Sequence, residues 1–141
     1  MKTLRELEAN VRGGQPLEIE LGDFLDAFYL GPSAARVEEP PALLTGANPQ
    51  GAMMDALLAA VAEYLCRRFS LPIPAWVYEP CRHLERPFFA LPSLAFRTTL
   101  LLESPMEFRS RNLFVTANAL SRASEHAALR TAPQRETTPV T

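Results

Sequence analysis

The sequence predicts a mostly α-helical fold, a single-domain irregular helical bundle with one long loop rich in proline and aromatic residues. Three observations favour this class. Apolar residues recur at helical spacing, helix start and stop signals flank them, and no alternation of strands and helices indicates a parallel sheet. The chain has 141 residues, which fits one domain. We expect residues 1–130 to form one helical domain and the polar residues 131–141 to form a flexible C-terminal tail.

The first helix is predicted from its end signals. Thr3 to Glu6 has the S/T-x-x-E pattern of a capping box, and the glycine pair at Gly13 follows as a stop signal. Residues 17–21 alternate in polarity and fit a short strand, whereas residues 21–29 place five apolar side chains on one helical face. We favour an extended lead-in at 17–21 followed by a second helix.

A short third helix is predicted to begin at Ser33 and to finish before Pro40, because a residue that precedes proline avoids helical angles. The strongest helix prediction follows it. Asn48 is the expected N-cap and Pro49 the expected first-turn residue, and an apolar stripe then runs from residue 57 to residue 69. We expect this helix to be central to the core.

Residues 70–92 contain five prolines, a density that rules out long regular elements. The same segment carries four aromatic residues, namely Trp76, Tyr78, Phe88 and Phe89. These side chains have to pack on the helices or on a partner. We favour the core for most of them, with one or two at an interface.

The last third of the chain shows weaker signals. Ser93 begins a predicted helix that reaches residue 102, although residues 98–102 also fit a strand. Residues 104–107 combine a cap, a first-turn proline and a glutamate, which predicts another helix start. Residues 118–130 have helical composition.

The net charge of −2 is unevenly distributed. Residues 1–66 contain 4 basic and 10 acidic residues, whereas residues 67–141 contain 10 basic and 6 acidic ones. We favour a patchwork of solvated faces. The alternative is a cationic C-terminal half that meets an acidic surface or nucleic acid.

No pattern in the sequence predicts catalysis, a cofactor or a metal. The motifs G-x-S-x-G, G-x-x-x-x-G-K-[ST] and G-x-G-x-x-G are all missing. The cysteines Cys66 and Cys81 and the histidines His83 and His126 do not have paired zinc-ligand spacing. We therefore expect a protein that is not an enzyme and that has neither a cofactor nor a metal site.

The location is predicted from two further patterns. No apolar run reaches the length of a membrane-spanning helix, and charges interrupt the N-terminal segment where a secretory signal would be apolar. We expect a cytoplasmic protein without membrane contact and with reduced cysteines.

Arg109, Arg111 and Asn112 form a polar cluster in an otherwise apolar region. Arginine suits bidentate contacts to phosphate. The sequence pI near 5.7 and the missing helix-turn-helix signature nevertheless make nucleic acid an unfavoured partner.

Short motifs between residues 62 and 123 carry a family resemblance. They are AEYLC at 62–66, PAW at 74–76, LERPFFA at 84–90, LESP at 102–105, FRSRNLFV at 108–115 and NALSRA at 118–123. Through them the chain resembles a family of small, poorly characterised bacterial proteins. Members of that family are often encoded beside a nucleotidyltransferase-fold protein, in an arrangement resembling a toxin–antitoxin pair.

The resemblance implies an antitoxin-like protein that binds and restrains a nucleotidyltransferase-fold enzyme. The alternative function is a small DNA-binding transcriptional regulator. We expect one aromatic residue and the polar motif residues to form a partner interface or a structural hydrogen-bond network: Trp76, Arg86, Arg109, Arg111, Asn112, Asn118 and Arg122. Homo-oligomerisation remains open.

Overall fold

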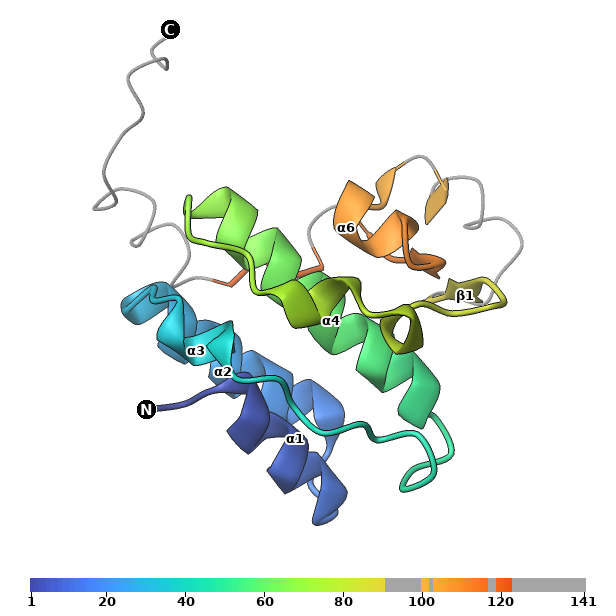
Figure 1. Ribbon diagram of the computed structural model, residues 1–141, viewed down its shortest axis with the longest axis horizontal. Coiled ribbons are helices and arrows are strands. Elements are labelled where there is room, and N and C mark those ends of the chain that lie inside the picture. The colour runs from blue at the N-terminus through green and yellow to red at the C-terminus, as the bar shows by residue number, and fades with distance from the viewer. Residues whose placement is uncertain (91–99, 102, 117–118, 123–141) are drawn as a thin grey trace, which may run out of the picture.

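The computed structural model describes residues 1–90, 100–101, 103–116 and 119–122. It is mostly helical, as predicted. Helix α4 (Gly51–Arg68) runs through the middle of the molecule. Helices α1 (Leu4–Arg12), α2 (Leu17–Leu30) and α3 (Ala35–Glu38) lie along one side of it, and α6 (Met106–Arg109) lies on the other side (Figure 1).

The core forms around α4 because this helix is covered on both sides. Its fully buried residues include Leu58, Val61 and Leu65, so the helix is apolar over more than one face. From α2, Phe28 packs edge-on against Phe69 just past the end of α4, with ring centroids 5.5 Å apart. The prediction of a central core helix is confirmed.

Two predicted helix boundaries are wrong. Helix α2 begins at Leu17 directly after Pro16, so residues 17–21 form its first turns instead of an extended lead-in. The helical geometry turns Glu20 inward, where Lys2 and Asn10 donate hydrogen bonds to Oε1 at 2.7 and 2.9 Å. The apolar Ile19 is left 58% exposed. Residues 17–21 are therefore helical despite their alternating pattern, and Glu20 is stabilised by contacts with α1 and the residue Lys2 before it.

Helix α4 begins at Gly51, later than the predicted cap at Asn48. The Asn48 side chain instead accepts a hydrogen bond from the Gln50 backbone at 2.9 Å. The chain entering from Leu44 crosses α4 closely, and a Cβ at Gly51 would collide with the Leu44 carbonyl group. Only glycine leaves room for this crossing.

The proline-rich segment contains only short elements. They are the 3₁₀ helices η1 (Ala75–Tyr78) and η2 (Pro80–Arg82) and the strand β1 (Phe88–Phe89). Strand β1 pairs in parallel with β2 (Leu113–Phe114), with Phe88 opposite Leu113. Because the parallel pairing is long-range in sequence, it fastens this segment to the chain that follows α6.

Among the aromatic residues of the proline-rich segment, Trp76 is buried, Phe88 and Phe89 are half-buried, and Tyr78 is 51% exposed.

Helix α6 follows Pro105 as predicted, but its four residues make it short. The Ser104 side chain does not cap it. Its hydroxyl instead donates to the Leu100 carbonyl at 2.6 Å and accepts from the Val115 amide at 2.8 Å.

Several predictions fall on residues outside those that the structure describes. They are most of the helix predicted at 93–102, most of the helical segment at 118–130, and the tail at 131–141. Within the described part, no helix combines the length and the apolar character that crossing a membrane requires.

Candidate functional site

The structure separates the predicted partner-binding residues by burial. Trp76 and Arg111 are buried, Asn112 is half-buried, and Arg86, Arg109 and Arg122 are exposed. Asn118 lies outside the described residues. The two buried side chains make internal contacts. The exposed arginines are the predicted residues whose side chains are open to solvent.

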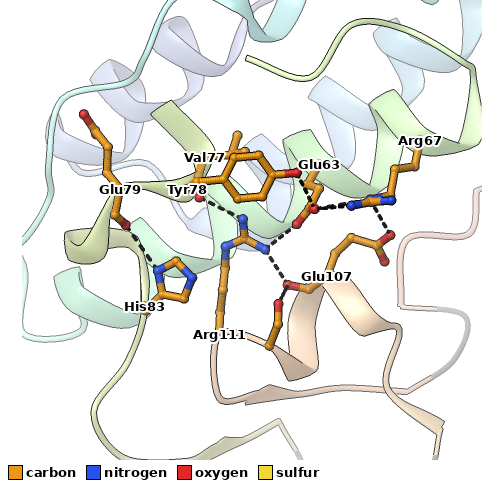
Figure 2. Close-up of polar contacts among 9 residues, drawn as sticks. Glu63, Arg67, Val77, Tyr78, Glu79, His83, Glu107 and Arg111 are labelled. Carbon is orange, nitrogen blue, oxygen red and sulfur yellow. Dashed lines mark hydrogen bonds and ion pairs between the residues drawn. The ribbon is translucent and has the colours of Figure 1, made fainter. Parts of the chain in front are cut away.

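Arg111 holds three segments together from the inside (Figure 2). One guanidinium nitrogen donates to Glu63 Oε1 at 2.7 Å and to the Glu107 carbonyl at 2.6 Å. The other terminal nitrogen donates to the Val77 carbonyl at 2.8 Å. These bonds connect α4, η1 and α6, and the residue is only 1% exposed. Arg111 therefore has a structural role within the fold.

The second carboxylate oxygen of Glu63 completes this polar network. It accepts hydrogen bonds from Arg67 at 2.9 Å and from the Tyr78 hydroxyl at 2.8 Å (Figure 2). Burial by itself raises the pKa of Glu63, but the hydrogen bonds from Arg111, Arg67 and Tyr78 outweigh it and lower the pKa below the ordinary value. The carboxylate is ionised at neutral pH and anchors the network.

The same contacts change the other titratable groups of the network. Burial, together with the hydrogen bond to Glu63, raises the pKa of Tyr78 above its ordinary value. The hydrogen bond to Glu63 likewise raises the pKa of Arg67. Tyr78 stays a neutral donor and Arg67 stays charged, so these two donors keep the protonation state in which they can donate to the Glu63 carboxylate.

Asn112 shapes the turn between α6 and β2. Its φ of 64° lies in the left-handed region, which asparagine tolerates better than most residues. Its side-chain amide donates to the Leu84 carbonyl at 2.8 Å, and its own carbonyl accepts from the Phe88 amide at 2.9 Å. The Leu84 amide in turn donates to the Arg111 carbonyl at 3.2 Å. Two of the sequence motifs therefore meet here through backbone and side-chain bonds.

An open groove lies next to this junction. We call it the α4 groove; it has a volume of about 310 Å³. Its lining residues come from the chain just before and at the start of α4 and from the segment before and within β1: Pro49, Gln50, Ala52, Met53, Leu84, Arg86, Pro87 and Phe88. Arg111 and Asn112 form hydrogen bonds with Leu84 and Phe88, so these two motif residues set the position of one wall.

The chain matches no protein-family model, and comparisons with curated proteins and with solved structures give no match either.

A second buried cluster was not predicted from the sequence. The Asp55 carboxylate accepts hydrogen bonds from the Leu44 amide at 2.6 Å and from the Thr45 hydroxyl at 2.6 Å. The Arg82 guanidinium lies 3.9 Å from Asp55, stacks 4.8 Å from the Trp76 ring centroid and donates to the Pro41 carbonyl at 2.6 Å. The cluster fastens the segment before α4 to the proline-rich segment.

One signal in the sequence points to this cluster. Asp55 is a lone carboxylate in the apolar segment 51–62, and a buried charge has to be paired and hydrogen-bonded. Trp76 also has an internal role, because its indole N–H donates to the Val37 carbonyl at 2.9 Å. Arg82 itself has no distinguishing sequence signal, since its partners come from elsewhere in the chain.

Arg122 pairs with Asp26 on α2 at 2.8 Å, and both side chains are 42% exposed. At this exposure the pair contributes little to stability, because solvent screens it. The hydrogen bond to Asp26 raises the pKa of Arg122. In this structure the guanidinium is engaged with α2, whereas the side chains of Arg86 and Arg109 form no ion pair with another described residue.

The remaining groups with metal or nucleophile chemistry are separate. Within the described part of the chain, no three His, Cys, Asp or Glu side chains are grouped to hold a metal ion. Burial raises the pKa of the Cys66 thiol to about 11, so this group stays protonated at neutral pH. Cys81 is exposed.

Proposed function

We propose that this chain is a non-catalytic protein-binding module of the cytoplasm, an antitoxin-like partner that restrains a nucleotidyltransferase-fold enzyme. The observation that carries the proposal is the α4 groove. Its lining combines apolar side chains with the exposed Arg86, a combination enriched at protein interfaces. One of the motifs behind the family resemblance, at residues 84–90, forms one wall of this groove.

The roles of the motif residues follow from their burial. Arg111 and Asn112 support the surface from beneath through the bonds to Glu63, Leu84 and Phe88. Arg86 presents a charge at the groove, and Arg109 presents one on α6. A rigid support under an exposed cation suits binding, because less side-chain freedom is lost when a partner docks.

Affinity purification tests the proposal. The tagged chain is isolated gently from its native organism after nuclease treatment, and bound proteins are identified by mass spectrometry. We expect one stoichiometric partner of the nucleotidyltransferase fold. The purified partner should then lose nucleotidyl-transfer activity as this chain is added, with the loss complete near equimolar amounts.

Purified enzyme that forms no complex with the chain and keeps its activity would contradict the proposal. A gel-shift titration with the DNA upstream of its own gene separates the alternative function. Specific binding that survives added salt would indicate a transcriptional regulator, since loose phosphate contacts weaken steeply with salt.

A further inference from the structure

We propose that the α4 groove receives a segment of the protein partner in which a carboxylate side chain lies next to an apolar one. This inference rests on the proposed function and names the chemistry of the bound segment. It follows from the charge of the groove, from its apolar floor and from its size.

Arg86 sets the charge of the groove. Among the described residues that line it, Arg86 is the only ionisable one, and its exposed side chain forms no ion pair or hydrogen bond with the rest of the described chain. Its neighbour Glu85 is exposed but does not line the groove. The first turn of α4, which does line it, contains no acidic residue. The local charge is therefore positive and complements a carboxylate.

The apolar part of the groove is continuous with the core. Met53, Leu84 and Phe88 are half-buried, pack against the core cluster and also line the groove. An apolar side chain placed on them leaves water without any rearrangement of polar groups. Met53 adds an adaptable surface, since methionine fills irregular gaps. The favourable occupant is thus apolar where it meets the floor and anionic where it meets Arg86.

The size of the groove fits a short segment of a partner and is too small for a whole domain. About 310 Å³ is at the lower end for ligand pockets and holds only a few side chains. The groove is open to solvent, so a segment of a partner chain can reach it. Its wall is held by the 2.8 Å bond from Asn112 to Leu84 and the 2.9 Å bond from Phe88 to Asn112.

The test uses the full chain, the purified partner and short overlapping peptides that cover the partner sequence. Three variants are compared with the wild type: Arg86→Glu, Met53→Glu, and the control Arg5→Glu on α1. The control reverses an exposed arginine that does not line the groove. Thermal melts establish that each variant is folded.

We expect Arg86→Glu and Met53→Glu each to weaken binding of the partner about tenfold or more, and the control to stay within about twofold. The peptides that bind should contain an acidic residue beside an apolar one. Replacing that acidic residue with lysine should restore binding to Arg86→Glu, because the charges are then exchanged across the contact.

Three results would overturn the inference. Unchanged affinity in both groove variants, with the partner still bound, would show that the partner does not bind in the α4 groove. The proposed function would remain intact. Binding peptides that are uncharged or basic would refute the chemistry of the segment. No complex with any protein partner would refute the proposed function, and the inference would end with it.

Discussion

Replacing Arg111 with methionine should strongly destabilise the fold. Methionine keeps most of the side-chain length but removes the guanidinium group that donates to Glu63, Glu107 and Val77. The Glu63 carboxylate then loses its most buried partner, and the Val77 carbonyl loses its 2.8 Å donor. Because Arg111 is 1% exposed, water cannot replace these contacts.

The size of the effect follows from this burial. Breaking a buried ion pair by removing one partner costs about 3–5 kcal/mol. A domain has about 5–15 kcal/mol of total stability, so the loss is a large part of it. Arg67 and Tyr78 still donate to Glu63 in the variant, which places the expected loss near the lower end, about 3 kcal/mol.

Urea denaturation at neutral pH measures this loss as a shift of the midpoint at constant slope. The matched control is Arg109→Met, an exposed arginine two positions earlier, which should change the free energy of unfolding by less than about 0.5 kcal/mol. The double variant Glu63→Gln with Arg111→Met should lose less than the two single variants combined, because the stranded carboxylate is then gone.

A loss below about 1 kcal/mol in Arg111→Met would refute the reasoning, since that is the value of a solvent-exposed ion pair. Strict additivity in the double variant would refute it too. It would mean that Arg111 and Glu63 contribute to stability independently of their 2.7 Å contact.

Three further predictions concern other parts of the fold. Gly51→Ala should destabilise by about 1–3 kcal/mol in urea, because the new methyl group meets backbone. The control Gly13→Ala, where the nearest atoms are 3.5 Å away, should be close to neutral; equal losses would contradict the close crossing. The lowered pKa of Glu63 means that the unfolded chain binds its proton more readily than the folded chain does. Stability from this group is therefore present above pH 4.5, its ordinary value, and is lost as the pH falls through the folded pKa. In Glu63→Gln, the free energy of unfolding should fall less steeply as the pH is lowered below 4.5. The same acid dependence as in the wild type would contradict the lowered pKa of Glu63. A thiol reagent at neutral pH should modify the exposed Cys81 rapidly, whereas the buried Cys66 should react only in denaturant; rapid loss of both thiols would contradict this burial.

Local signals predicted the helical part of the fold. Thr3 caps α1 as expected, its hydroxyl accepting from the Glu6 amide at 3.1 Å, and the apolar stripe after residue 57 lies in the central helix. Proline density predicted the short elements of 70–90. These features depend on residues that are near each other in the chain, so periodicity and turn chemistry are sufficient to find them.

Boundaries that depend on distant contacts were not predicted. The start of α2 is coupled to the bonds of Glu20 with Lys2 and Asn10, and the start of α4 to the crossing of Leu44 over Gly51. Neither contact has a signature in the local pattern. For the same reason the Asp55–Arg82 pair was not found.

Arg109 and Arg111 show most directly what the sequence determines and what the tertiary structure determines. By itself the sequence determined that a mostly helical chain carries a polar cluster of arginines after a helix start. Only the tertiary structure decided that Arg111 is buried against Glu63, 48 positions away in sequence, while Arg109 remains exposed. The physical reason is that burial of a charge depends on a partner and on the packing around it, and both are supplied by remote parts of the chain.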